Sequence, residues 1–423
     1  MRRRVVITGM GAVTPLGNDV PNTWKRLISG KSGISELTRF NLDDYGKQEN
    51  VQKIAGEVRK FNLENWGVSH HIEIEKIQLN VKRMDLFVQY ALAAAIEAVD
   101  DAQLDLKKEN LKKIGVEIGC AFAGATTWEE QHIRLLKKGS RRVSAFFIPM
   151  VLANMVSGNL SIYFGTKGPN LVMCTACAAA SHAIGEAFLK IRYGMVNIMI
   201  TGGTQAVLRP LAFSGFNNMR ALSHNNDNPE KASRPFDLNR DGLVMAEGAG
   251  ILVLEELKHA EKRKAKIYGE LIGFGMNSDA CSIVNPCVEG PAECMRIALR
   301  DARIRLMDID YINAHGTSTQ IGDINEAKSI REVFQTFADY FYVGSTKSAT
   351  GHMFGAGGAV EAIFCILALR NGIIPPMINL ENPDPECDLK FAPKKAVKID
   401  IVHALSNSFG FGGTNACLAF KKY

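Results

Sequence analysis

Cys177 stands where a cysteine can act as a nucleophile. It follows the strand-like run 170–174, Asn-Leu-Val-Met-Cys, and precedes an alanine-rich stretch typical of a helix without an obvious cap. A cysteine at such a turn lies at the positive end of the helix, where the dipole and the free N–H groups stabilise a thiolate. The thiolate is the form that attacks a thioester. A buried, unreactive cysteine is the alternative that Cys177 alone leaves open.

Two histidines follow predicted strands in the second part of the chain. His315 lies in the run 313–319, Asn-Ala-His-Gly-Thr-Ser-Thr, and His352 ends the run 345–352, Ser-Thr-Lys-Ser-Ala-Thr-Gly-His. A single histidine in such a place is more often structural than catalytic. Two histidines at matching strand ends, together with a cysteine at a helix start, predict a Cys/His/His site.

A glycine-rich run at 406–415, Ser-Asn-Ser-Phe-Gly-Phe-Gly-Gly-Thr-Asn, stands just before the last predicted strand. Glycines at this density favour a mobile loop whose backbone N–H groups can point into a site. The alternative is a tight turn between two strands. We favour a functional loop because the other motifs also lie where strands end.

Two other kinds of site are disfavoured. The opening run 9–14, Gly-Met-Gly-Ala-Val-Thr, lacks the third glycine and the acidic residue of a dinucleotide fingerprint. Cys174 and Cys177 form a CxxC pair, but a zinc site needs a second pair. The cysteines that would have to supply it have the wrong spacing: Cys281, Cys287 and Cys294. We therefore expect no metal and no tightly bound cofactor.

The elements that must position these residues alternate between short β-branched or apolar runs and helical stretches. This alternation predicts an α/β protein with a largely parallel central sheet. The strand series that begins at 5–8 starts again near residue 267 and closes at 416–420. We therefore predict two similar halves, residues 1–258 with the cysteine and residues 259–423 with both histidines and the glycine-rich loop.

Composition excludes several classes of protein. The 423 residues are 46% hydrophobic and 22% charged, as in a soluble globular protein. Nine cysteines without a secretory signal favour free thiols and a cytoplasmic location. The net charge of +6 is modest, and no basic block interleaved with aromatic residues indicates nucleic acid. The most apolar stretch, 356–369, is interrupted by Glu361 and is too short to cross a bilayer, so no membrane span is expected.

Taken in order, these runs resemble the β-ketoacyl-acyl-carrier-protein synthases of the thiolase superfamily, most closely synthase II and its relatives. The match covers nearly the whole chain and includes 5–17, Val-Val-Ile-Thr-Gly-Met-Gly-Ala-Val-Thr-Pro-Leu-Gly, and 232–237, Ala-Ser-Arg-Pro-Phe-Asp. The resemblance implies a five-layered α/β/α/β/α thiolase fold made of two duplicated halves. It also implies decarboxylative Claisen condensation of an acyl group with malonyl-acyl-carrier protein, both carried on 4′-phosphopantetheine arms.

The resemblance implies a role for each matched residue. Cys177 receives the acyl group, while His315 and His352 hydrogen-bond the enolate that forms from the malonyl group. Backbone N–H groups of Cys177 and Phe409 form the oxyanion hole. Lys347, with Glu326 as its expected partner, orients the site and tunes the charge of the histidines. The same match supplies the pantetheine contacts and the gating loop, which are Thr317, Thr319, Phe409, Gly410, Gly412 and Gly413.

Partners also follow from the resemblance. The family binds an acidic acyl carrier protein and is usually dimeric, pairing through the strand that precedes the nucleophile. We expect either a homodimer or a heterodimer with a chain-length-factor-like subunit that lacks the cysteine. Basic residues stand where the family places its carrier-protein patch: Lys82, Arg83, Arg141, Arg142 and Arg220.

Three places depart from the synthase II pattern. Ser282 and Val284 replace a histidine and a threonine near the pocket entrance, and Ala246 replaces a glycine. Phe122 occupies a position that borders the acyl pocket and is usually small or aliphatic. A phenylalanine there would fill the space for a long straight chain, which predicts a short or redirected acyl chain.

Two pathways fit these observations. Fatty-acid elongation is slightly favoured because most matches are to that branch, and the catalytic ketosynthase of a type II polyketide or aryl-polyene system is the alternative. A non-catalytic partner subunit is disfavoured because the cysteine, both histidines and Lys347 are all present. A biosynthetic thiolase would need a second catalytic cysteine near the C-terminus, and Cys417 has no histidine beside it.

Overall fold

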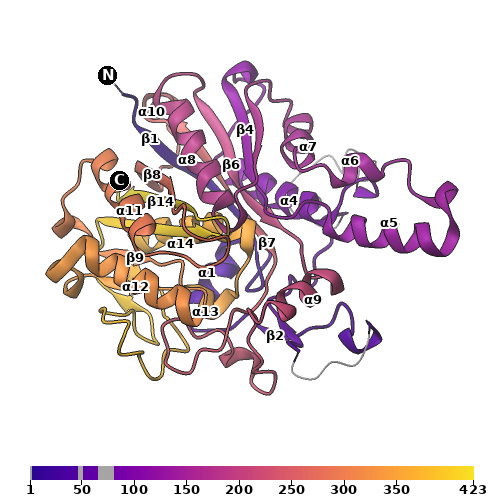
Figure 1. Cartoon of the computed structure of the whole chain (residues 1–423). Helices are drawn as coiled ribbons and strands as arrows, with labels where there is room; N and C mark the ends of the chain where they lie inside the picture. The colour runs from indigo at the N-terminus through magenta and orange to yellow at the C-terminus, as the bar shows by residue number, and fades with distance from the viewer. Residues whose placement is uncertain (1, 46–50, 65–80) are drawn as a thin grey trace.

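The computed structural model describes residues 2–45, 51–64 and 81–423. A ten-stranded mixed sheet runs through this part of the chain (Figure 1). Its strands in chain order are β1 (Val5–Val13), β4 (Ile114–Gly119), β5 (Asn170–Met173), β6 (Ile198–Gln205), β7 (Gly248–Glu256), β8 (Gly269–Ser278), β9 (Tyr311–Asn313), β10 (Tyr342–Gly344), β13 (His403–Gly410) and β14 (Thr414–Lys421). Two short pairs accompany it: β2 (Ser35–Glu36) with β3 (Ile54–Ala55), and β11 (Ile373–Ile374) with β12 (Val397–Lys398).

The sheet contains an internal repeat. Its two sets of five strands, β1-β7-β6-β4-β5 and β8-β14-β13-β9-β10, meet where β1 pairs with β8. In each set the first two pairings are antiparallel and the last two are parallel. One strand of each set, β7 or β14, therefore runs against the other four. The predicted duplication is confirmed, but the prediction of a largely parallel sheet is wrong for the sheet as a whole. Of the nine pairings between these ten strands, four are parallel and five are antiparallel, including that of β1 with β8. β14 has to be antiparallel to β13, because residues 411–413 between them are too few for a crossover.

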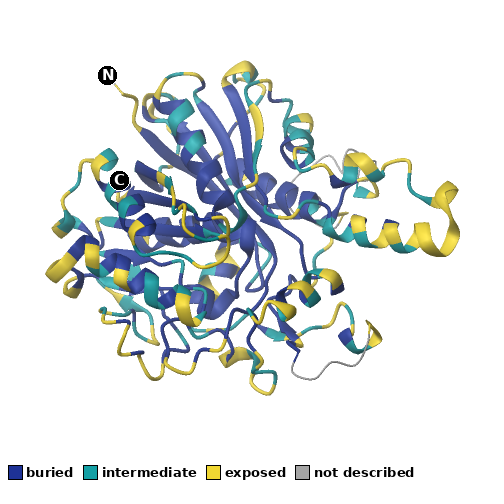
Figure 2. Ribbon diagram, in the orientation of Figure 1, coloured by how far each residue is buried: buried dark blue, intermediate teal, exposed yellow. Residues whose placement is uncertain are grey.

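Helices on both faces of each set complete the predicted five layers. Between the sets lie α8 (Ala179–Arg192), which contacts β6 and β14, and α14 (Gly357–Asn371), which contacts β7 and β13. The outer faces are covered by α4 (Leu86–Asp101) on the first set and α11 (Glu289–Ala302) on the second, with α12 (Gln320–Phe334) packed behind α11. The central position explains the sequence of α14, which is apolar on nearly all sides and buried from Gly357 to Leu369 (Figure 2).

Within residues 2–45, 51–64 and 81–423, seven other α-helices surround this body. They are α1 (Val20–Ile28), α5 (Ala125–Lys138), α6 (Phe147–Val151), α7 (Met155–Phe164), α9 (Pro210–Asn218), α10 (Leu257–Lys262) and α13 (Lys347–Thr350). Among them α5 extends away from the body and is largely exposed toward its far end (Figures 1 and 2).

Within the described residues, one helical stretch is long and apolar enough to cross a membrane by length and composition. It is Phe354–Asn371, which ends with α14 and is longer than the run 356–369 considered in the sequence. Length therefore does not exclude a span, contrary to the prediction. Its place in the fold is nevertheless that of a core helix, since 89% of the stretch is buried inside the protein.

Candidate active site

The motifs singled out in the sequence follow the carboxyl ends of strands, and they line one cavity. Cys177 follows β5, His315 follows β9, and His352 follows β10 by way of the short helix α13. The crevice outside the carboxyl ends of the strands is the usual place for a ligand in an α/β sheet. A cavity of about 670 Å³ lies here, and its lining includes all three side chains.

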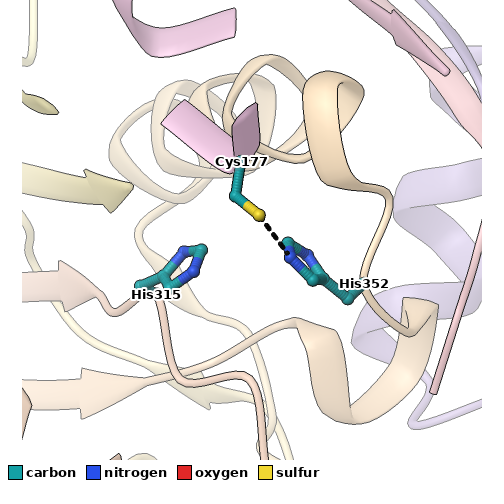
Figure 3. Close-up of side chains that lie close together, drawn as sticks. All are labelled: Cys177, His315 and His352. Carbon is teal, nitrogen blue, oxygen red and sulfur yellow. Dashed lines mark hydrogen bonds between the residues drawn. The ribbon is translucent and has the colours of Figure 1, made fainter. Parts of the chain in front are cut away.

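Cys177, His315 and His352 point toward one another (Figure 3). The Sγ of Cys177 lies 3.1 Å from Nε2 of His352. The two imidazole rings are 5.4 Å apart between centroids and nearly perpendicular, at 87°. The sulfur and one nitrogen of each ring all lie within 4.8 Å of one another. A carbonyl group placed between these atoms would therefore contact the nucleophile and both rings.

The turn that carries Cys177 is strained and tied down. Ala176 has a φ of +48°, in the left-handed region that a residue with a Cβ rarely adopts. Backbone strain of this kind costs about 1–3 kcal/mol and persists where the surroundings overdetermine it. The hydroxyl of Thr175 lies 2.8 Å from Nδ1 of His182, and Nε2 of that histidine lies 3.2 Å from the carbonyl oxygen of Asn415 on β14. These contacts connect the turn to the second strand set.

Burial raises the pKa of the Cys177 thiol to about 12. The positive charge of Lys347 and the N–H groups of Phe411 and of Cys177 itself lower the pKa, but burial outweighs them. Burial therefore opposes the thiolate that the position of Cys177 just before α8 predicts. A helix terminus stabilises an anion by at most about 2 kcal/mol, which a large desolvation penalty exceeds.

Lys347 is paired with Glu361 on α14, and both side chains are almost completely buried. The prediction that Glu326 is the partner of Lys347 is wrong. Glu326, on α12, instead accepts hydrogen bonds from the backbone N–H groups of His315 at 2.8 Å and Gly316 at 2.7 Å. Burial raises the pKa of Glu326 to about 7, against the effect of these N–H groups. Glu326 therefore holds the His315 turn, and Glu361 neutralises the lysine.

Both histidines are electrically neutral near pH 7. Burial lowers the pKa of His315 and of His352 well below the ordinary value, and the positive charge of Lys347 lowers it further. A neutral imidazole has one N–H, so each ring donates one hydrogen bond and accepts one. Nδ1 of each ring is buried without a hydrogen-bond partner among the described residues. A ligand in the cavity can therefore influence which nitrogen carries the proton.

Most residues that the resemblance places around the substrate line the cavity, namely Phe122, Thr317, Thr319, Phe409, Gly410 and Gly413. Gly412 lies outside this lining and donates its N–H to the carbonyl oxygen of Ile283 at 2.7 Å. Gly410 lies against the nucleophile turn, because a Cβ there would stand 3.1 Å from the oxygen of Thr175 and 3.2 Å from the nitrogen of Cys177. The close approach of this loop therefore favours glycine.

Phe122 belongs to the cavity wall, and Gln205 fixes its backbone. The N–H of Phe122 donates to Oε1 of Gln205 at 3.2 Å, and Nε2 of Gln205 donates to the carbonyl oxygen of Phe122 at 2.8 Å. Gln205 is fully buried at the end of β6. The phenyl ring is thus held at the wall by a fixed backbone, while 47% of the residue stays exposed in the single chain.

The predicted basic residues occupy two places. Arg220 lines the cavity, as do Ser282 and Val284, which depart from the synthase II pattern. The other predicted basic residues are exposed and lie outside the lining: Lys82, Arg83, Arg141 and Arg142. Arg83 lies over the ring of Phe146, 4.2 Å from its centroid. The residues 141–142 follow α5, the helix that extends from the body (Figure 1).

Two minor sequence observations are explained by packing. Ala246 is buried against Gly56, where a Cβ would lie 2.6 Å from the Ala246 methyl group, so the missing side chain at 56 makes room for it. Cys417 is buried in β14 and lies outside the cavity lining, unlike the second cysteine that a thiolase needs. All nine cysteines are free, which confirms the expected thiols.

Four contributors to the site were missed in the sequence: Glu361, Gln205, His182 and the N–H of Phe411. Glu361 had a signal, because a charge inside the apolar run 356–369 must find a partner when the helix is buried. Gln205 and His182 carried no comparable signal, since a polar residue inside a strand or helix pattern does not reveal which backbone group it will bond.

Comparison with known proteins places the chain in a family. A family model described as "Beta-ketoacyl synthase, N-terminal domain" matches residues 2–260, and one described as "Beta-ketoacyl synthase, C-terminal domain" matches residues 268–381. The chain is 47% identical over 423 residues to the 3-oxoacyl-[acyl-carrier-protein] synthase 2 of Staphylococcus aureus (strain COL), with 100% of this chain and 99% of that protein covered.

Solved structures agree over the full length. The ishigamide ketosynthase/chain length factor gives a TM-score of 0.90 at 34% identity and covers 100% of both chains. A type II PKS acyl-carrier protein in complex with its ketosynthase bound to the hexaketide gives a TM-score of 0.90 at 32% identity, again over 100% of both chains. The two strand sets with their three helix layers are therefore the thiolase fold that the resemblance implied. The chain belongs to the β-ketoacyl synthase family.

Proposed function

We propose that this chain is a β-ketoacyl-acyl-carrier-protein synthase that elongates fatty-acid-type chains, with Cys177 as the acyl acceptor. The observation that carries the proposal is the cluster of one thiol and two neutral imidazoles in a single cavity. The thiol can serve as a nucleophile, and the two imidazoles can donate hydrogen bonds to an oxyanion as it develops. Neither imidazole places a permanent charge at the reacting carbon. The activity of the 47% identical relative agrees with the proposal.

Acylation is the first step. The Cys177 sulfur attacks the thioester carbonyl of the acyl-carrier protein, a new C–S bond forms, and the pantetheine thiol leaves with the proton that the cysteine loses. Since burial favours the neutral thiol, we propose that its proton leaves as the substrate enters. The N–H groups of Cys177 and Phe411, which both act on the Cys177 sulfur, are the proposed donors to the carbonyl oxygen during this step, in place of the expected N–H of Phe409.

Decarboxylation and condensation follow. The bond between the malonyl carboxylate and its neighbouring carbon breaks, CO₂ leaves, and the electron pair forms an enolate whose oxygen accepts hydrogen bonds from His315 and His352. The enolate carbon then attacks the acyl group on Cys177, and the sulfur leaves and takes up a proton. Neutral rings fit this role because each has an N–H to donate without a net charge.

The partners are an acyl carrier protein and a second subunit. Thr317 and Thr319, whose hydroxyl groups lie 3.1 Å apart in the cavity wall, are the proposed contacts of the pantetheine arm. Arg220 and the exposed basic residues near α5 are the proposed carrier-protein patch. The second subunit is proposed to pair with β5, the edge strand that precedes Cys177. The halves 1–258 and 259–423 stay our proposed division of the chain.

The test is acyl-enzyme formation followed by mass spectrometry of the intact protein. Incubation with acyl-carrier protein should add one acyl group to the native chain and none to Cys177→Ala. Cys174→Ala is the matched control, because Cys174 is exposed and stands three residues earlier. It should acylate like the native chain. Acyl transfer to Cys177→Ala would refute the assignment of the nucleophile.

A second candidate function rests on Phe122. A ring in the cavity wall fits a type II polyketide or aryl-polyene ketosynthase that works with a chain-length-factor subunit, as in the solved ishigamide pair. Co-expression with a cysteine-less homologue, followed by native mass spectrometry, distinguishes the polyketide function from the fatty-acid function. A stable heterodimer would favour the polyketide candidate, and a homodimer that elongates acetyl groups alone would favour fatty-acid synthesis.

A further inference from the structure

A loop at the mouth of the cavity brings together two thiols and a carboxylate outside the reacting cluster. The entrance loop, residues 279–287, connects β8 to the region before α11. One carboxylate oxygen of Asp279 and the sulfurs of Cys281 and Cys287 all lie within 4.8 Å of one another. The spacing of these cysteines gave no metal motif, but the loop folds back so that both sulfurs meet Asp279. We propose that Asp279, Cys281 and Cys287 bind a thiophilic divalent cation such as Zn²⁺, and that the ion controls entry to the cavity.

The ligand set has the chemistry that Zn²⁺ prefers. Tetrahedral zinc takes sulfur at about 2.3 Å and carboxylate oxygen at about 2.0–2.2 Å, so its ligand atoms stand about 3.5–3.8 Å apart. The three atoms therefore need to close by only about 1 Å. Cys281 is exposed and Cys287 is half-buried, so an ion from solvent can reach both. Binding M²⁺ would release the two thiol protons and leave one coordination position for water.

Asp279 is already held in place for this role. Its Oδ1 accepts a hydrogen bond from Nδ2 of Asn415 at 2.6 Å, and its Oδ2 accepts one from the backbone N–H of Cys287 at 3.2 Å. The carboxylate also fits against two glycines: a Cβ at Gly290 would lie 1.9 Å from Oδ1, and one at Gly413 would lie 2.8 Å from the Asp279 Cβ. Groups that orient a ligand in this way strengthen metal binding.

The entrance loop is hydrogen-bonded to the glycine-rich loop next to Cys177. The N–H of Gly412 donates to the carbonyl oxygen of Ile283 at 2.7 Å. The N–H of Asp279 donates to the carbonyl oxygen of Gly413 at 2.8 Å. An ion that joins Cys281 to Cys287 would close the entrance loop around Ile283 and so restrain Gly412. The effect on entry rests on the proposed function, because it matters only if a pantetheine arm must pass this loop.

Binding can be tested without any assay of activity. The protein is prepared reduced and free of metal, with Cys177→Ala as the background so that the Cys177, His315 and His352 cluster lacks its thiol. Titration with Co²⁺ should produce a thiolate-to-cobalt charge-transfer band that saturates at one equivalent and disappears when Zn²⁺ is added. Adding Cys281→Ser and Cys287→Ser should abolish the band. The absence of a band in the parent, or its survival in this variant, would overturn the site.

Two further variants test whether the cobalt band arises from the entrance loop and whether Asp279 is a ligand. Cys174→Ser removes an exposed thiol outside the loop and should leave the cobalt band unchanged. Asp279→Asn keeps the shape of the side chain but removes its charge, so it should weaken cobalt binding while circular dichroism stays native. Unchanged affinity in Asp279→Asn would contradict the assignment of the carboxylate as a ligand.

Control of entry is tested with Cys177 intact, each protein being compared with its own metal-free rate. One equivalent of Zn²⁺ should slow acylation by acyl-carrier protein in the native chain several-fold and have no such effect in Cys281→Ser/Cys287→Ser. Equal slowing in both proteins would place the effect at Cys177 and refute the control of entry. A protein that binds cobalt but never acylates would refute the proposed function and leave the metal site standing.

Discussion

The ammonium group of Lys347 is paired with the carboxylate of Glu361 beneath the cavity, and its charge lowers the pKa of His315 and of His352. The pair joins the short helix α13, which ends just before His352, to the central helix α14. Because both groups are buried, each depends on the other to offset the loss of hydration. The pair therefore serves the stability of the fold and the charge state of the histidines together.

Removing one partner should cost far more stability than removing both. Lys347→Met leaves a buried carboxylate alone, and breaking a buried ion pair in this way costs about 3–5 kcal/mol. The double variant Lys347→Met/Glu361→Gln has no uncompensated charge and should recover most of that loss. Urea unfolding of the native chain, the single variant and the double variant measures the difference. A double variant as unstable as Lys347→Met would show that the charge is not the cause.

The same double variant should move the acid limb of the pH profile. Lys347 lowers the pKa of both histidines, so its removal raises both values, and the rings become protonated at a higher pH. A protonated His352 no longer has an acceptor nitrogen for the thiol proton of Cys177, whose Sγ lies 3.1 Å from its Nε2. Acylation of Cys177 by acyl-carrier protein, measured from about pH 5 to 8, should therefore decline at a higher pH than in the native chain. An unshifted limb would mean that the lysine does not tune the rings.

Much of this site could be predicted, because its residues follow strand ends that are visible in the sequence. The strand-like runs before Cys177, His315 and His352 correctly predicted that these residues follow the carboxyl ends of strands, which are β5, β9 and β10. β5 and β10 stand at opposite ends of the sheet order, and the packing of the two strand sets around α8 and α14 brings their carboxyl ends to one cavity. The family resemblance named the chemistry.

What could not be predicted depends on packing between segments far apart in the chain. Glu326 and Glu361 both lie in helices that follow the histidine motifs, and only their contacts decide which carboxylate meets Lys347. The thiol pKa likewise reflects the depth of burial, which a helix-start position does not reveal. The meeting of Cys281 with Cys287 depends on the path of an irregular loop, for which no periodic pattern exists.

Gly410→Ala should slow acylation of Cys177. The added Cβ would stand 3.1 Å from the Thr175 oxygen and 3.2 Å from the Cys177 nitrogen, so the strained nucleophile turn would have to yield by a few tenths of an ångström. Small displacements of reacting groups cost large factors, and we expect roughly ten-fold in the single-turnover acylation rate. Gly215→Ala is the matched control, because a Cβ there meets nothing within 4 Å. Native acylation by Gly410→Ala would show that the loop tolerates the methyl group.

Phe122→Gly should widen the range of acyl chains. The native ring occupies part of the cavity wall, so we expect acetyl- or butyryl-carrier protein to acylate Cys177 far faster than a long-chain acyl-carrier protein. Without the ring, the long chain gains space and its rate should approach that of the short ones. Acylation rates for both chain lengths in both proteins are the measurement. Equal rates in the native chain would contradict a limit set by Phe122.

Leu171→Asp should disrupt pairing with the second subunit. β5 is the last strand of its set and pairs, among the described residues, only with β4, so its outer edge is open. Leu171 on this strand is 45% exposed, and Ile162 on α7, which contacts β5, is 76% exposed. An open edge with apolar side chains invites pairing with another strand, and a charge on it opposes that pairing. Native mass spectrometry should therefore find the native chain as a dimer and Leu171→Asp as a monomer. Leu238→Asp, at another exposed leucine, should remain dimeric. A native chain that is already monomeric would refute the proposed homodimer. In that case the native chain should form a heterodimer with a cysteine-less homologue, and Leu171→Asp should fail to form it.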